Sequence, residues 1–357
     1  MPHVPLQPPP LPPTLYDDII HLPAGDGGGR ITTPAEWAIK RADIRRRFLG
    51  ILGEPPARRP APVARIIDEV QDDDLTRRRI AYAVEDDEDC EAFLLLPRAP
   101  RGDGAAVLCL SATFVNGKDV LAGLAELPEH WLARDLARRG FIVLAPDHFC
   151  AGARAPQDRR FADDALYRRH PRWSALGKAL WDGTAAIDVL AAAPGVDPRR
   201  IGCTGASLGG HGSIFLAAYD ERIAAAVAMV GSTAWRADSE RMHWCRDWWY
   251  RYAPALREGF LAGRVGTPEG VPVDMMEIAA LIAPRPFLDI AALNDENVGA
   301  ESGVYVKDAW LRVSDAYAIL GAESAFAFVT HRHGHRLPEW TRACSFAFLA
   351  QHLGAAR

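Results

Sequence analysis

The segment 203–210 constrains the fold of this 357-residue chain more than any other stretch. The apolar residues at its start indicate the end of a short buried strand, and residues 212–219 indicate a helix. Ser207 therefore lies on the turn between them, with a glycine two positions to either side. Such a turn is strained and brings the helix close to the strand, where a Cβ atom would collide. We expect a serine hydroxyl held beyond the edge of a sheet, with the Leu208 N–H beside it.

Apolar runs that suit buried strands alternate with helical stretches along most of the chain. The expected strands are 106–111, 141–145, 201–204, 224–230, 287–292 and 325–330. The expected helices are 34–52, 128–139, 178–193, 208–219, 304–320 and 338–353. Two β-like runs between residues 76 and 96 flank an acidic turn and predict an antiparallel hairpin. This order predicts an α/β fold with a mostly parallel twisted sheet covered by helices on both faces, in which ligands bind beyond the carboxyl ends of the strands.

Two segments depart from this alternation. Residues 1–74 begin with a proline-rich stretch and continue into the expected helix 34–52, so we interpret them as an N-terminal arm with a helical extension preceding a single domain over 75–357. Residues 231–270 follow a strand and are rich in aromatic side chains, among them Trp244 and Trp248. We expect this insertion to cap the serine and to contribute these two tryptophans to a substrate pocket, and the alternative is an ordinary aromatic core.

A serine nucleophile needs a base, and the base needs an acid that orients it. The acid is expected after a late strand, where Asp295 stands just past an apolar run. Glu296 is the near alternative, and Asp289 is disfavoured because it sits inside the strand. The base is expected after the last strand, where His335 follows Gly334, a residue that allows the backbone to turn sharply. The order serine, acid, histidine is the one that α/β-hydrolases use.

Other histidines near these positions have different interpretations. Three histidines at alternate positions, 331, 333 and 335, suggest a metal site, but no cysteine or carboxylate within that loop completes a ligand set, so we predict no metal. His211 belongs to the helix that begins beside Ser207, and we interpret it as a structural residue or part of the pocket wall.

An oxyanion hole needs two N–H donors. The Leu208 N–H is one candidate. The other is expected from the turn after the strand 106–111, where the backbone N–H of Thr113 or Phe114 would face Ser207. The alternative is that this turn is only a connection between a strand and a helix.

The bulk properties exclude some partners. A net charge of −5 gives no overall attraction to nucleic acid or to an anionic membrane surface. No apolar stretch reaches the length of a membrane span, and the N-terminus has no pattern of a signal peptide, so we expect a cytoplasmic protein. The six cysteines lack paired spacing, which fits a reducing compartment. The proline-rich arm and the aromatic insertion are compatible with a homodimer.

Several motifs together resemble the α/β-hydrolase superfamily, and within it bacterial esterases similar to dienelactone hydrolases and acetyl xylan esterases. The matching segments are 140–147, 152–154, 177–178, 181–182, 196–202, 205–210, 220–223, 283–286 and 334–335. The chain departs from this pattern at Ser111-Ala112, where relatives often carry His-Gly, and at Ser207, where true dienelactone hydrolases use cysteine. The resemblance therefore does not specify the second oxyanion donor, and the serine favours other ester substrates.

The resemblance implies an enzyme that hydrolyses a small-molecule ester without a cofactor. Ser207, Asp295 and His335 would form its catalytic triad, and acetyl or other short acyl esters would be its substrates. Two alternatives remain from the sequence. One is a serine peptidase of the prolyl-oligopeptidase type, although the roughly 75 residues before the domain leave no room for the usual propeller. The other is a non-catalytic binding module with a hydrolase fold.

Overall fold

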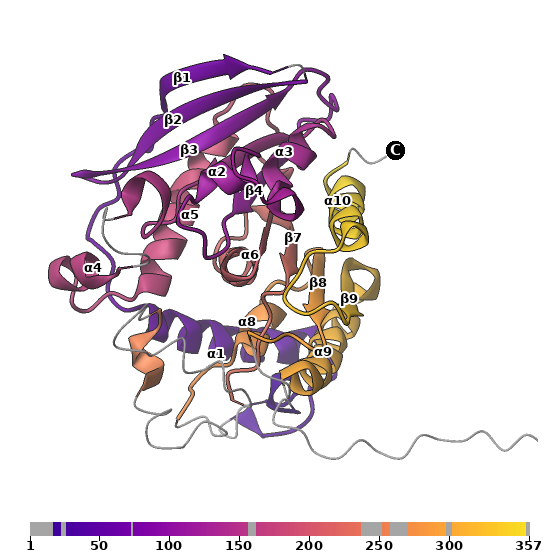
Figure 1. Cartoon of the computed structure of the whole chain (residues 1–357). Helices are drawn as coiled ribbons and strands as arrows, with labels where there is room; N and C mark the ends of the chain where they lie inside the picture. Colours follow the sequence, from indigo (N-terminus) through magenta and orange to yellow (C-terminus); the bar gives the residue numbers. More distant parts are fainter. Residues whose placement is uncertain are drawn as a thin grey trace, which may run out of the picture.

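The computed structural model describes residues 17–22, 26–72, 74–155, 162–236, 252–257, 270–297 and 302–354. A nine-stranded sheet runs through these residues in the order β1-β2-β3-β5-β4-β6-β7-β8-β9 (Figure 1). Its strands are β1 (Arg65–Gln71), β2 (Leu75–Glu85), β3 (Glu88–Pro97), β4 (Ala106–Leu110), β5 (Ile142–Pro146), β6 (Ile201–Ala206), β7 (Ile223–Met229), β8 (Phe287–Ala292) and β9 (Phe326–His331).

The sheet has an antiparallel and a parallel part. Strands β1, β2 and β3 pair antiparallel with their neighbours, and β3 also pairs antiparallel with β5. From β5 through β9 all pairs are parallel. The carboxyl ends of these six strands therefore meet at one edge, which is where an α/β sheet binds its ligands.

Helices cover both faces of the sheet, as the sequence predicts. They are α1 (Pro34–Leu52), α2 (Lys118–Leu121), α3 (Leu132–Ala137), α4 (Asp164–Arg169), α5 (Ala175–Ala191), α6 (Leu208–Tyr219), α8 (Met275–Ala280), α9 (Ser302–Ile319) and α10 (Glu339–Leu353). Short 3-10 turns are η1 (Asp17–Ile20), η3 (Pro128–His130), η4 (Gly152–Arg154), η6 (Pro254–Leu256) and η7 (Glu323–Ala325).

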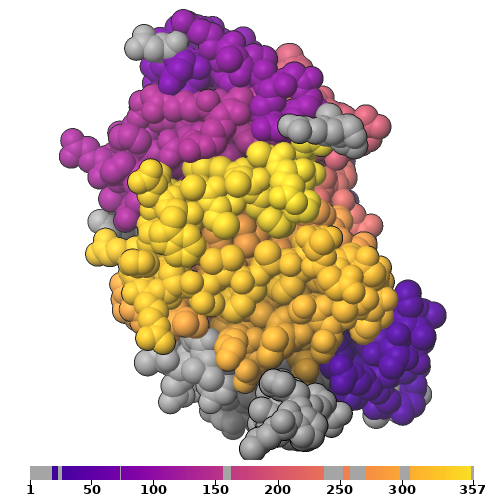
Figure 2. Space-filling view, turned by 90° about the vertical axis from the view of Figure 1, so that its right-hand side faces the viewer, coloured from indigo at the N-terminus to yellow at the C-terminus, as the bar shows by residue number. Residues whose placement is uncertain are grey.

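Two apolar cores lie on opposite faces of the sheet. One contains the buried side chains of α1, α5, α6, α8 and α9, and the other contains those of α2, α3 and α10. Alternate residues of a strand point to opposite faces, so Leu108 of β4 belongs to the first core and Val107 to the second. Figure 2 turns α9 and α10 toward the viewer, where they form a band across the molecule with the indigo N-terminal residues beside it.

The N-terminal part packs onto the core that contains the buried side chains of α5, α6, α8 and α9. Helix α1 contacts α5, α8 and α9, and η1 contacts α9. Trp37 and Phe48 of α1 are almost fully buried. Because β1 pairs with β2, the sheet begins at Arg65, inside the range 1–74 that we interpret as the N-terminal extension. No helix in the described ranges is long and apolar enough to cross a membrane.

Candidate active site

Ser207 occupies a strained turn between β6 and α6. Its φ is 54° and its ψ is −120°, a left-handed conformation that is uncommon for a residue with a side chain. A Cβ at Gly205 would lie 2.5 Å from the carbonyl carbon of Gly209, and a Cβ at Gly209 would lie 2.1 Å from the Leu110 oxygen. The steric need for these two glycines is therefore confirmed. They allow α6 to begin directly against the ends of β4 and β6.

The residues after β7 contribute a second strained position beside this turn. The Ser207 N–H donates to the Met229 oxygen at 2.9 Å, so the turn is attached to the end of β7. The next residue, Val230, also has a positive φ, 42°, which is exceptional for a β-branched side chain. A Cβ at Gly231 would lie 2.6 Å from the Cα of Gly210. Strained backbone of this kind concentrates at functional sites.

His335 and Asp295 lie in contact although they are 40 residues apart. The His335 Nδ1 is 2.8 Å from one Asp295 carboxylate oxygen and 3.0 Å from the other. Asp295 is buried, whereas His335 is partly accessible. A buried carboxylate at this distance fixes the orientation of the imidazole and leaves Nε2 to face other groups.

The two other carboxylates considered from the sequence have different partners. Glu296 accepts a hydrogen bond from the backbone N–H of His335 at 2.8 Å and therefore holds the loop. Asp289 is fully buried within β8 and accepts from the Ser232 hydroxyl at 2.7 Å. Burial raises the pKa of Asp289 to about 7. The geometry thus favours Asp295 among the three as the partner of the imidazole.

The backbone around Gly334 presents His335 to these groups. Gly334 has a φ of 66°, so it makes the sharp turn that the sequence suggests. Its N–H donates to the Asn294 side-chain oxygen at 3.1 Å. Together with the contacts of Asp295 and Glu296, this bond joins the loop after β9 to the loop after β8 at three successive residues.

The turn after β4 lies next to the serine turn, because Leu110 pairs with Gly205. Within it the Phe114 N–H donates to the Ala112 oxygen at 2.7 Å, so this N–H is already engaged, and Thr113 is the remaining candidate of the two. The buried carboxylate of Asp147 stabilises the far side of this turn. It accepts from the Lys118 N–H at 2.9 Å and pairs with the Lys118 ammonium at 2.6 Å.

His130 is a candidate site residue that the sequence does not reveal. Its ring packs edge to face against Phe114, with 4.7 Å between the centroids. Burial, and the neighbouring His335 and Arg342, lower the pKa of His130 to about 4. The imidazole is thus neutral, and it packs against the turn after β4. It stands in η3, within the expected helix 128–139, and no motif of a catalytic residue surrounds it, so nothing in the sequence singles it out.

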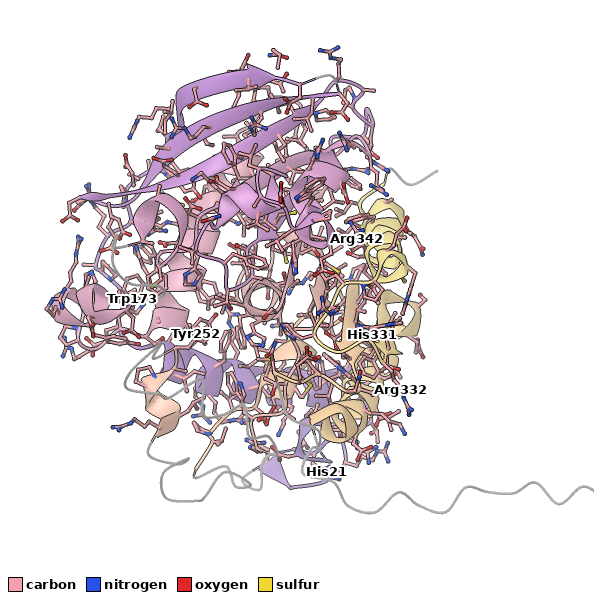
Figure 3. All side chains as sticks on the ribbon, viewed as in Figure 1. His21, Trp173, Tyr252, His331, Arg332 and Arg342 are labelled. Carbon is pink, nitrogen blue, oxygen red and sulfur yellow. The ribbon has the colours of Figure 1, made fainter. Side chains whose placement is uncertain are left out.

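The remaining predicted site residues fall into two groups. His211 is buried one turn into α6, and its backbone N–H donates to the backbone carbonyl oxygen of Ser207 at 2.9 Å. Trp244 and Trp248 lie outside the described residues. Of the three alternating histidines, His331 and His333 pack ring to ring at 5.7 Å, whereas His335 turns to Asp295. Figure 3 shows His331 and Arg332 on the side of the molecule that carries α9 and α10.

The chain is similar in sequence to a family of esterases and to a hydrolase. A family model described as "Glucuronyl esterase, fungi" matches residues 153–321, a range that includes Ser207 and Asp295 but ends before His335. The Bacillus subtilis (strain 168) protein named "Putative hydrolase YtaP" is 26% identical over 300 residues, which are 83% of this chain and 94% of the relative.

Solved structures of esterases share the fold. A glucuronoyl esterase from Solibacter usitatus superposes with a TM-score of 0.71 at 17% identity, covering 97% of this chain and 99% of the other. A promiscuous CE15 esterase from a marine bacterial metagenome gives a TM-score of 0.73 at 14% identity, covering 96% and 98%. The predicted α/β-hydrolase fold is confirmed, and the family match together with the Bacillus subtilis relative supports a carboxylesterase-like hydrolase.

Proposed function

We propose that this protein hydrolyses small carboxylic esters through Ser207, His335 and Asp295. His335 takes the proton of the Ser207 hydroxyl as its oxygen attacks the ester carbonyl, and Asp295 stabilises the imidazolium that forms. The oxyanion is stabilised by the Leu208 N–H and a second donor from the turn after β4, for which Thr113 is the candidate.

The two halves of the reaction use the same residues. When the tetrahedral intermediate collapses, the bond to the leaving alcohol breaks and His335 gives its proton to that oxygen. The product is an ester between the acyl group and Ser207. Water then attacks this acyl-enzyme, with His335 again taking the proton, and the free carboxylic acid and the Ser207 hydroxyl are released.

One observation carries this proposal: a left-handed serine turn and an imidazole held 2.8 Å from a buried carboxylate both occur after parallel strands of one sheet. His130 supplies a second connection, because its ring contacts Phe114 in the turn beside Ser207 and the neighbouring His335 helps to lower the pKa of His130. Neither arrangement is needed for the stability of an α/β sheet.

Kinetics on p-nitrophenyl acetate test the proposal. Ser207→Ala is expected to lower kcat by roughly 10⁵- to 10⁶-fold and Asp295→Asn by about 10⁴-fold, because the three groups act as a unit. Ser213→Ala is the control, since it removes a buried hydroxyl of the same helix, which donates to the Gly209 backbone oxygen. Hydrolysis by Ser207→Ala at the rate of the control would contradict the proposal.

The match to fungal glucuronyl esterases supports a second candidate substrate, an ester in which a sugar acid supplies the acyl group. The two candidates differ in which side of the ester carries the sugar. Comparing an acetylated sugar with the methyl ester of a uronic acid separates them, because the acyl group is small in the first and a whole ring in the second.

A further inference from the structure

A cavity of about 60 Å³ lies between α5 and α6, at the carboxyl ends of β4 and β5. Helix α6 contributes a stripe at positions 208, 212 and 216, which recur on one face of a helix. Helix α5 faces it with Ala179, Leu180 and Gly183. Tyr252 also lines it and is attached to α5, because the Leu176 backbone N–H donates to the Tyr252 backbone carbonyl oxygen at 2.9 Å. Figure 3 shows Tyr252 below Trp173, which stands two residues before α5.

One end of this cavity borders the candidate catalytic centre. Leu208, which lines it, follows Ser207 directly and carries the proposed oxyanion N–H. Ser111 lines it from the turn after β4. An acyl group attached to the Ser207 oxygen would therefore enter the cavity beside Leu208 and lie against the α6 stripe.

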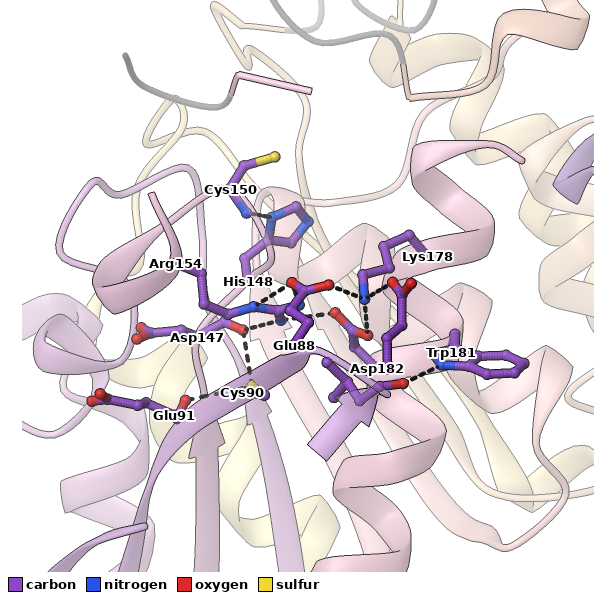
Figure 4. A network of polar contacts seen from close by, with 12 residues as sticks. Glu88, Cys90, Glu91, Asp147, His148, Cys150, Arg154, Lys178, Trp181 and Asp182 are labelled. Atoms are coloured by element: carbon purple, nitrogen blue, oxygen red, sulfur yellow. Dashed lines mark hydrogen bonds and ion pairs between the residues drawn. The ribbon is translucent and has the colours of Figure 1, made fainter. Parts of the chain in front are cut away.

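The polar groups in the cavity wall already have partners within the protein (Figure 4). Asp182 pairs with Arg154 at 2.8 Å and with Lys178 at 3.0 Å. Asp147 pairs with a lysine, and the Cys150 N–H donates to His148 Nδ1 at 3.2 Å. The remaining wall is mainly leucine, alanine, glycine and aromatic carbon. A ligand in the cavity therefore meets hydrocarbon, which suits an alkyl chain better than a sugar with several hydroxyl groups.

The size of the cavity limits the length of that chain. A cavity of about 150 Å³ holds benzene, so 60 Å³ is too small for any six-membered ring. The surrounding elements pack closely, because a Cβ at Gly183 of α5 would lie 3.0 Å from Leu216 Cδ1 of α6, and a Cβ at Gly212 of α6 would lie 3.0 Å from Leu110 Cδ1 of β4. The space fits an unbranched chain of about two to four carbons.

We propose that this cavity is the acyl-binding pocket and that the substrate is an ester of a short aliphatic acid, from acetyl to about butyryl. The inference rests on the proposed function and assigns the acyl side of the ester to the α5–α6 cavity. The alcohol, including any sugar, then lies outside it. Residues 179 and 180 set the permitted chain length.

Hydrolysis of p-nitrophenyl esters with acyl chains of two to ten carbons tests this. Ala179→Leu fills the cavity and is expected to lower kcat/KM for butyrate relative to acetate by about tenfold. Leu180→Ala enlarges it and is expected to move the optimum toward hexanoate by a similar factor. Ala191→Leu is the matched control, because it adds the same side chain to a half-buried alanine at the other end of α5, away from the cavity. The control is expected to keep the wild-type profile.

The outcomes separate this inference from the proposed function. If all variants hydrolyse esters with the wild-type chain-length profile, the cavity is not the acyl pocket but the esterase activity stands. Faster hydrolysis of a uronic acid methyl ester than of an acetylated sugar would also overturn the inference alone. Absence of turnover with every ester, in a wild-type chain whose near-ultraviolet circular dichroism shows a folded protein, would remove both. Near-ultraviolet spectra of each variant check that its core is intact.

Discussion

At the scale of single residues, the site depends on a few positions where the backbone leaves its ordinary conformations. Ser207 and Gly334 both have positive φ, and each precedes a residue with an assigned role, Leu208 and His335. Such conformations cost free energy, and they persist mainly at sites where they orient functional groups. Changes in backbone freedom here should therefore affect catalysis more than stability.

Gly334→Ala tests this with a close control. Gly334 has a φ of 66° and its Cβ would lie 2.5 Å from a Glu296 carboxylate oxygen, whereas Gly321 has a φ of 65° and nothing within 4 Å. Both alanine variants lose a similar amount of stability, about 1 kcal/mol, from the left-handed conformation. Only Gly334→Ala is expected to displace His335 and lower kcat/KM, on the order of a hundredfold. Equal kcat/KM values for the two variants would contradict the role of this loop.

At the scale of elements, a buried ion-pair network ties the β2–β3 hairpin to α5 and η4. Lys178 of α5 contacts Glu85 at 2.6 Å and Glu88 at 2.8 Å, and Arg154 of η4 pairs with Glu88 and Asp182 (Figure 4). The network joins the antiparallel part of the sheet to the helix that lines the cavity. Breaking it by removing one partner leaves a buried charge uncompensated.

The network predicts how stability depends on pH. Burial alone would raise the pKa of Glu88, but Arg154 and Lys178 lower it from 4.5 to about 2. The stabilisation is therefore complete above pH 4.5 and declines as the pH falls toward 2. Glu88→Gln should be less stable than wild type at pH 7 and approach it in acid, as measured by urea unfolding between pH 7 and 3. Glu69→Gln changes an exposed pair with Arg78, so its free energy of unfolding should stay close to that of wild type from pH 7 to pH 3. A constant gap between wild type and Glu88→Gln over this range would refute this assignment.

Element prediction from the sequence succeeds where local signals agree with the packing. The helix Pro34–Leu52 begins and ends as predicted, because Thr33 and Glu36 form a capping box and proline occupies its first position. Strand β1 is missed, since all but one of its residues are exposed and no alternation marks its faces. Helix α8 is missed because it is short and buried on all sides. The candidate site shows the same pattern: Ser207, Asp295 and His335, which we propose as the triad, stand next to strong strand or turn signals, whereas His130 does not.

At the scale of the whole molecule, the N-terminal extension is part of the larger core. Phe48 of α1 is fully buried, and its ring lies 6.1 Å from that of Phe215 in α6. Phe48→Ala is expected to lower the free energy of unfolding by about 3–5 kcal/mol, because it leaves a cavity between two helices. Leu49→Ala, at a position that is 40% exposed on the same helix, should cost far less. Urea unfolding measures both, and equal losses would show that α1 does not stabilise the core.

The central claim is that the Ser207 oxygen is the atom that attacks the ester. A fluorophosphonate reacts covalently with an activated serine, so peptide mapping by mass spectrometry after labelling identifies that residue directly. We predict one adduct, on the peptide that contains Ser207, which is lost in Ser207→Ala and forms much more slowly in Asp295→Asn. An adduct on a different serine, or equal labelling of wild type and Ser207→Ala, would contradict the account.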